Sequence, residues 1–118
     1  MQRIMMKSKL HRATVTDADL HYEGSVSIDE TLLKAANIVP YEKVAIYNIT
    51  NGERFSTYAI TGKADTGIIC LNGAAARKVS KGDLIIIVTY VNVDEADVPV
   101  WKPVCVLLDG DNRIKTIT

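Results

Sequence analysis

Apolar and polar residues alternate along most of the chain, which is the pattern of β-strands with one buried face. In the N-terminal segment Ile4, Met6 and Leu10 share one parity. The opposite parity is basic, at Arg3, Lys7, Lys9 and His11. A second alternating run covers residues 13–15. The pattern predicts an N-terminal strand that buries one face and presents a cationic one.

Two longer runs, residues 43–50 and 53–61, are joined by Asn51-Gly52. Both joining residues tolerate positive φ, so they predict a β-hairpin with this dipeptide as its turn. Residues 84–91 are apolar on both parities, which predicts a strand buried on both faces. Shorter strands are predicted over residues 68–71, 101–108 and 114–117, with a loop at 62–67 and a turn at 81–83.

Little helix is predicted. Asp29 can cap a short helix over residues 30–37, which carries an apolar stripe and is followed closely by Pro40. Residues 72–77 predict a turn that leads into one helical turn. With no linker or repeat, the pattern predicts a single domain over residues 1–118. Its fold class is all-β, a small barrel or sandwich with one or two short helices.

Composition narrows the class of protein. The chain has 118 residues, with 14 Lys and Arg against 14 Asp and Glu. Zero net charge argues against a general nucleic-acid or membrane binder, which normally has a basic excess. No apolar run can span a bilayer, and the N-terminal segment lacks the apolar stretch of a signal peptide. Cys70 and Cys105 have no metal-ligand spacing, so we expect buried free thiols, no metal site and a cytoplasmic protein.

The cationic N-terminal face has two interpretations. It can be a solvated outer face that keeps an edge strand soluble. Alternatively, Lys7, Lys9 and His11 form a surface for a small anion such as a carboxylate or a phosphate. The alternation alone leaves both open.

Two later stretches also contain candidate chemistry. NGERFSTYAI places Arg54 and Tyr58 on one strand face and Thr57 on the other. Arg offers a bidentate fork to a carboxylate, and a tyrosine phenol can transfer a proton; both can equally be rim residues of a barrel. LNGAAARK is a strand end followed by small residues. These either let backbone N–H groups approach a ligand or pack a tight turn.

The Gly24-Ser25 step is ordinarily a surface turn. It can also carry chemistry, because a serine hydroxyl can attack the preceding glycine carbonyl when the backbone is strained. The amide then becomes an ester, elimination cuts the chain, and hydrolysis with loss of ammonia leaves a pyruvoyl group. The ketone of that group can form a Schiff base with an amine and act as an electron sink.

Three blocks agree in order and spacing with a known family. KSKLHRATVTDADLHYEGSVSIDE, NGERFSTYAI and NGAAARK followed by GD resemble the pyruvoyl-dependent aspartate 1-decarboxylases of the pantothenate pathway. The resemblance covers about residues 6–112. It implies a double-psi β-barrel, usually a homotetramer, and a precursor that cleaves itself into residues 1–24 and 25–118.

The resemblance also implies roles for individual residues. Ser25 becomes the pyruvoyl group, and Tyr58 is the proton donor. The processing site is formed by Gly24, Ser25, Thr57 and Asn72. Substrate is contacted by Lys9, Arg54, Thr57, Gly73, Ala74 and Ala75. Near the site are His11, Tyr22 and Tyr47, the last at a position where the family often has Trp.

The implied reaction converts L-aspartate to β-alanine and CO2. The substrate amine condenses with the ketone derived from Ser25, and Tyr58 protonates the carbanion. Lys9 and Arg54 hold the two carboxylates, in an order that the sequence does not assign. Two other functions fit the residues: an amide hydrolase with Ser25 as N-terminal nucleophile, and a non-enzymatic β-barrel binding module. A maturation partner is neither required nor excluded by these residues.

Overall fold

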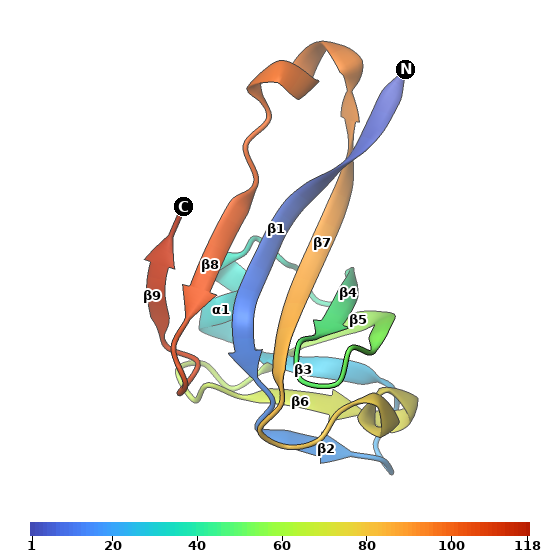
Figure 1. The fold of residues 1–118 in the computed structure, drawn as a ribbon, viewed down its shortest axis with the longest axis vertical. Helices are drawn as coiled ribbons and strands as arrows, with labels where there is room; N and C mark the ends of the chain where they lie inside the picture. Colours follow the sequence, from blue (N-terminus) through green and yellow to red (C-terminus); the bar gives the residue numbers. More distant parts are fainter.

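The structure is a computed structural model that describes residues 1–118. It contains nine strands and three short helical segments (Figure 1). The strands are β1 (Gln2–Thr14), β2 (Asp17–Asp19), β3 (Ser25–Asp29), β4 (Lys43–Asn48), β5 (Arg54–Gly62), β6 (Ile69–Asn72), β7 (Leu84–Asp94), β8 (Val104–Leu108) and β9 (Ile114–Ile117). The helical segments are the α-helix α1 (Glu30–Ala35) and the 3-10 helices η1 (Gly73–Lys78) and η2 (Glu95–Val100).

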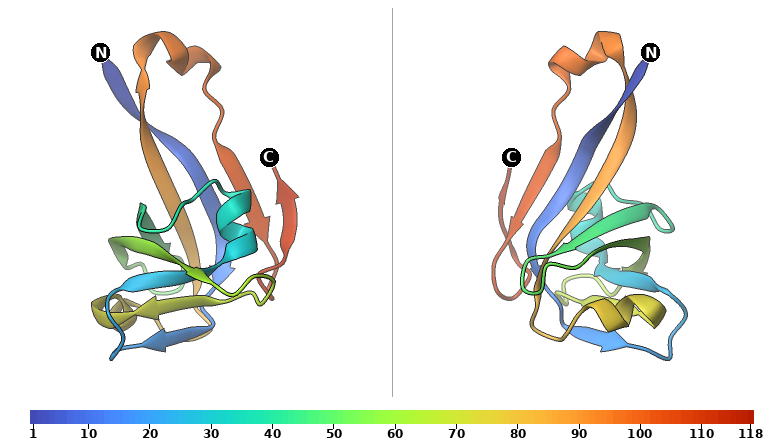
Figure 2. Two further views of the ribbon diagram at one scale, coloured as in Figure 1. Left: turned by 180° about the vertical axis from the view of Figure 1, so that it is seen from behind. Right: turned by 45° about the vertical axis from the view of Figure 1, so that its right-hand side comes forward.

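All the strands join one sheet, in the order β2-β6-β3-β5-β4-β7-β1-β8-β9. Three neighbouring pairs are parallel, namely β1–β8, β2–β6 and β3–β5. Figure 2 shows that β2, β3 and β6 cross the direction of β1 and β7, so the sheet wraps around one core. The core side chains with no exposed surface include Leu10, Val26, Ile28, Ile46, Ile69, Leu71, Ile85, Ile87 and Val106. The predicted all-β fold, a small barrel, is confirmed.

The N-terminal half of β1 and the C-terminal half of β7 project from the barrel as a two-stranded arm, with η2 at its tip (Figure 1). Ile4 is therefore 75% exposed and Met6 is only half-buried, so the predicted burial of this face is wrong at Ile4 and incomplete at Met6, whereas Ser8 and Leu10 are buried. Shifts in the β1–β7 register after Met6 and after Leu10 also break the simple alternation. Arg12, with φ 64, lies at the second shift.

The predicted hairpin forms from β4 and β5, but its loop is longer than the predicted two-residue turn. Strand pairing ends at Tyr47 and Arg54. Gly52 has the expected positive φ, 79. The loop begins at Asn48, whose side-chain oxygen accepts a hydrogen bond from the backbone N–H of Thr50 at 2.9 Å.

Several other expectations need correction. There are three short helical segments rather than one or two, because η2 forms around Pro99 at the tip of the arm. The alternating run expected at residues 13–15 is not a separate strand, because Ala13 and Thr14 are the last residues of β1. α1 ends before Asn37, which has a left-handed φ of 54. Cys70 and Cys105 are half-buried rather than buried. Tyr90 is 46% exposed, so β7 is not buried on both faces at its C-terminal end.

None of the helical segments has the length and apolar character needed to span a bilayer.

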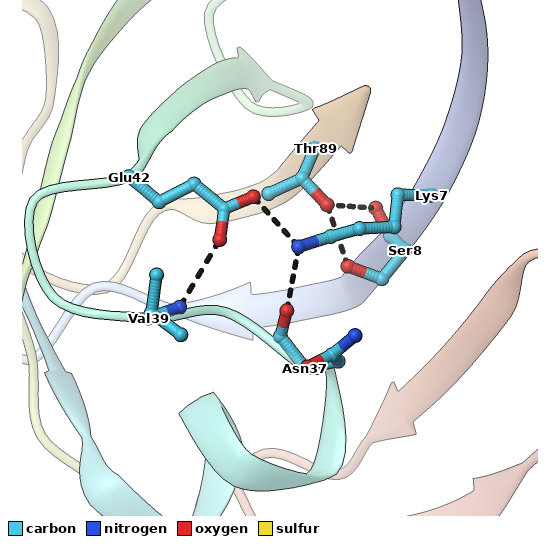
Figure 3. A network of polar contacts seen from close by, with 6 residues as sticks. All are labelled: Lys7, Ser8, Asn37, Val39, Glu42 and Thr89. Atoms are coloured by element: carbon cyan, nitrogen blue, oxygen red, sulfur yellow. Dashed lines mark hydrogen bonds and ion pairs between the residues drawn. The ribbon is translucent and has the colours of Figure 1, made fainter. Parts of the chain in front are cut away.

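Lys7 belongs to a structural ion pair rather than to a solvated cationic face. Its Nζ donates to the Glu42 carboxylate at 2.7 Å and to the Asn37 carbonyl at 2.6 Å. The two charged side chains are only 18% and 21% exposed. Glu42 also accepts from the backbone N–H of Val39, so the network ties β1 to the segment after α1 (Figure 3).

Asp29 holds α1 and the loop before β6 together. Asp29 is only 2% exposed. Its carboxylate accepts hydrogen bonds from the backbone N–H groups of Thr31, Asp65 and Gly67 at 2.8, 3.0 and 2.8 Å. Burial alone would raise the pKa of Asp29, but these donors outweigh it and hold the pKa below its ordinary value. The predicted helix cap is confirmed, and it also anchors a distant loop.

We expect Asp29 to make the fold acid-sensitive. Its pKa is lower in the folded than in the unfolded chain, so its stabilisation is present above the unfolded value and is lost as pH falls through the folded one. Asp29→Asn should lower the free energy of unfolding by about 1–3 kcal/mol near neutral pH. It should also make the free energy of unfolding depend less on pH below about pH 4. Urea unfolding across this range measures both, with the exposed Asp97→Asn as control. Equal pH slopes for Asp29→Asn and the parent chain would contradict the prediction.

Candidate functional site

The Gly24-Ser25 step lies at the start of β3, where this strand pairs with β6. The antiparallel register sets Ser25 opposite Asn72. Ser25 is fully buried, and Asn72 is 3% exposed. The Asn72 side-chain amide donates to the Ser25 Oγ at 3.1 Å. The serine hydroxyl is therefore enclosed beside a hydrogen-bond donor rather than exposed on a surface turn.

The backbone at this step is strained. Ser25 has a φ of 131, a region that residues with a Cβ rarely adopt. Such a conformation costs on the order of 1–3 kcal/mol and persists only where the surrounding structure enforces it. Gly24 has open space where a Cβ would be, with no atom within 4 Å. The backbone at Ser25 is thus strained, and Gly24 has free space on the side where a side chain would lie.

Gly73 packs directly against the same step. A Cβ at this position would lie 2.9 Å from both the Cα and the N of Gly24, and 3.0 Å from the Tyr22 carbonyl oxygen. Gly73 also has a φ of 63, which glycine adopts without strain. The turn from β6 into η1 can therefore press against residues 22–24 only because it begins with glycine.

A cavity of about 260 Å³ opens beside the step. It is lined by Gly24, Phe55, Ser56, Thr57, Asn72, Ala74, Ala75 and Lys78. Thr57 reaches it because β5 runs parallel to β3, with Ala59 opposite Val26. The residues predicted for processing and the small residues of η1 thus converge within one chain.

Some residues of this region were not predicted. Phe55, Ser56 and Lys78 line the cavity, and Ser27 accepts a hydrogen bond from Asn72 at 3.1 Å. Ser27 has the parity of Ser25, so strand alternation would have placed it on the same face. Nothing in the local pattern marks Lys78, because η1 brings it to the cavity only through the tertiary fold.

Lys9 and His11 lie at a different cavity. This second cavity, of about 270 Å³, is also lined by Cys105, Leu107, Thr116 and Thr118. The His11 Nδ1 is buried without a hydrogen-bond partner. Burial lowers the pKa of His11, and the positive charges of Lys9 and Arg12 lower it further. Near neutral pH the imidazole is therefore uncharged beside the Lys9 ammonium.

Arg54 is held by aromatic residues rather than by an acid. Its guanidinium carbon lies 3.8 Å from the centroid of the Tyr47 ring, a cation–π contact across the β4–β5 pair. The Tyr47 hydroxyl is in turn 2.7 Å from that of Tyr90. No carboxylate lies within ion-pairing distance of Arg54. The guanidinium N–H groups are thus available to an external anion.

Tyr58 and Tyr22 do not line the first cavity. Tyr58 is 38% exposed and shares the outer face of β5 with Arg54, as the alternation predicts. Its ring centroid is 6.3 Å from that of Tyr41. The Tyr22 side chain is 54% exposed, although its carbonyl oxygen lies close to Gly73. Lys9, Arg54 and Tyr58 are thus not among the residues that line the cavity beside the Gly24-Ser25 step.

Comparison with known proteins identifies the family. The family model for aspartate decarboxylase matches residues 1–115, nearly the whole chain. The chain belongs to the aspartate decarboxylase family.

Individual members of the aspartate decarboxylase family are close in sequence. The chain is 69% identical over 115 residues to an aspartate 1-decarboxylase of Syntrophus aciditrophicus, covering 98% of this chain and 99% of that protein. An aspartate 1-decarboxylase of Syntrophobacter fumaroxidans is 64% identical over 113 residues, with coverage of 96% and 91%. One of Myxococcus xanthus is 59% identical over 114 residues, with coverage of 97% and 88%. The resemblance carried by the three sequence blocks is confirmed, whereas the roles of single residues stay predictions.

The contact between Gly73 and Gly24 gives a test of the site geometry. Gly73→Ala should destabilise the chain more than Gly82→Ala. Both positions have positive φ, but only a Cβ at Gly73 meets backbone atoms within 4 Å. We expect Gly82→Ala to lower the free energy of unfolding by about 1–2 kcal/mol. Gly73→Ala should lower it by about a further 1–3 kcal/mol, because backbone must shift. Urea unfolding measures both, and equal losses would show that the close approach is absent.

Proposed function

We propose that this chain decarboxylates L-aspartate at its α-carboxylate, giving β-alanine and CO2, with a pyruvoyl group made from its own Ser25. The observation that carries the proposal is the buried Ser25 hydroxyl at the strained Gly24-Ser25 bond. Family membership supports the choice of substrate, because the relatives are named aspartate 1-decarboxylase. The β-alanine would serve pantothenate, and hence coenzyme A, synthesis.

The residues around Ser25 suit self-cleavage. The Ser25 Oγ attacks the Gly24 carbonyl carbon and loses its proton, and the C–N bond breaks. The amide thereby becomes an ester, and the Ser25 nitrogen gains a proton. The donor of Asn72, 3.1 Å from Oγ, stabilises the charge that grows there. Thr57, at the same cavity, is the candidate donor to the carbonyl oxygen of Gly24.

Elimination then cuts the chain. Loss of the α-proton of Ser25 breaks its Cβ–Oγ bond and releases residues 1–24 with the Gly24 carboxylate. Water replaces the α-nitrogen of residue 25, which leaves as ammonia, and a ketone remains at the head of residues 25–118. When present, a pyruvoyl group supplies a ketone that takes up an amine and accepts the electron pair released with CO2.

The other residues would bind the substrate and move a proton. Arg54 is stacked on Tyr47 without a carboxylate partner, so its bidentate donors suit a substrate carboxylate. Lys9, beside an uncharged His11, is the second cation. A pair of cations favours a dicarboxylate, because an apolar amino acid would leave one charge unmatched. Tyr58 is the proposed donor of the proton that replaces CO2.

We also propose that the site is completed in a homotetramer. A second copy would supply Lys9, which lines a different cavity from Gly24 within one chain. The proposed setting is the cytoplasm, with L-aspartate as the small-molecule partner and no nucleic-acid or membrane partner.

The cofactor proposal predicts the masses of the chain. We expect the parent chain to yield two fragments whose summed mass equals the chain plus water minus ammonia. Ser25→Ala should stay intact and folded, with no β-alanine production, because the nucleophile is absent. Intact-mass measurement and an assay for β-alanine test both. Fragments that differ only by added water would favour an amide hydrolase with Ser25 as N-terminal nucleophile. An uncut parent chain without activity would favour a binding module.

Tyr58→Phe separates the two reactions. Cleavage at Gly24-Ser25 should be retained, whereas kcat for decarboxylation should fall at least about 100-fold, as for loss of a general acid. Tyr41→Phe removes the neighbouring phenol and is the matched control, with unchanged kcat. Steady-state release of CO2 measures the effect, and parental turnover by Tyr58→Phe would remove this residue as the acid.

A further inference from the structure

Four polar side chains form a hydrogen-bonded group on one face of the β3–β6 pair. In the register Ser25 lies opposite Asn72, and Ser27 lies opposite Cys70. The Asn72 Nδ2 donates to the Oγ atoms of Ser25 and Ser27, both at 3.1 Å. The Cys70 Sγ donates to the Asn72 Oδ1 at 3.3 Å. Both ends of the Asn72 amide are therefore held by β3 or β6 side chains.

Cys70 is the member that distinguishes the two ends of the amide. A half-turn of the Asn72 amide exchanges its oxygen and its nitrogen. A serine hydroxyl accommodates either end, because it can donate or accept. A thiol is a weak acceptor, so its proton favours contact with Oδ1. Burial raises the pKa of Cys70, and the charges of Asp17 and Asp19 on β2 raise it further, which keeps the thiol protonated.

The orientation of this amide affects the reactive hydroxyl. With the nitrogen toward Ser25, an N–H donor meets the Oγ as its proton leaves and negative charge develops. With the amide reversed, the partial negative charge of Oδ1 would face the same atom and oppose that development. Ser25 is fully buried and does not line the cavity, so water cannot readily replace the missing donor.

We infer that Cys70 and Ser27 are positioning residues for the cut at Gly24-Ser25, holding the Asn72 amide with its nitrogen toward the Ser25 hydroxyl. The inference rests on the proposed self-cleavage and deepens it. Neither residue takes part in bond making. Cys70 orients the amide through Oδ1, and Ser27 holds the second N–H so that the first stays directed at Ser25.

The rate of the cut tests this role directly. The full chain is synthesised in a cell-free system, and timed samples are analysed by intact mass. Cys70→Ala removes the donor to Oδ1 and should slow cleavage by about three- to tenfold, the effect of one modest hydrogen bond. Cys70→Ser restores a donor at the same position and should return cleavage to near the parental rate. Ser27→Ala should also slow the cut.

Two controls separate positioning from folding. Cys105→Ala removes the other free thiol, which lies on β8 at the second cavity, and should cleave at the parental rate. Each substitution is also placed in the Ser25→Ala chain, which cannot cleave itself, and its thermal unfolding is measured. A slower cut with an unchanged midpoint then reports on the amide rather than on the fold.

Three results would overturn the role of Cys70 in positioning the Asn72 amide. A parental rate for Cys70→Ala overturns the role of Cys70 while the proposed function stands. Equal slowing by Cys70→Ala and Cys70→Ser also overturns it, because lost packing would then explain both. A parent chain that never splits at Gly24-Ser25 overturns the inference together with the proposed function.

Discussion

The pairing of β3 with β6 is the constraint on which the candidate site depends. One register puts Ser25 opposite Asn72 and brings the turn at Gly73 against Gly24. A slip of one residue would send every β3 side chain to the other face of the sheet. Ser25 would then lose its amide partner, and the fully buried Val26 would leave the core. Core burial on one face of β3 therefore fixes the chemistry on the other.

The same strand explains how a strained bond can persist. β3 is hydrogen-bonded on both sides, to β5 and to β6, and Asp29 at its end anchors α1 and the loop at 65–67. Burying Val26 and Ile28 contributes about 1.5–3 kcal/mol each, against a strain at Ser25 of about 1–3 kcal/mol. The fold can therefore hold the Gly24-Ser25 backbone in a conformation that a free peptide would abandon.

The basic residues divide between structure and binding. Lys7 is enclosed with Glu42 and joins two parts of the barrel, so it is committed to the fold. Lys9 and Arg54 have no carboxylate partner, and Arg54 is oriented by the ring of Tyr47. Cations that are positioned but not neutralised suit a dicarboxylate ligand. Assembly enters the proposed function because Lys9 and Gly24 line different cavities within one chain.

The sequence by itself determined the features that depend on near neighbours. Alternation predicted most strands, Asp29 predicted the start of α1, and three blocks predicted the family. It could not predict the longer hairpin loop, the exposure of Ile4 on the projecting arm, or the separation of Lys9 from Gly24. Strand parity states which face a side chain occupies, but not which distant strand lies beside that face. That choice belongs to the tertiary structure, because it follows from how the whole sheet closes over one core.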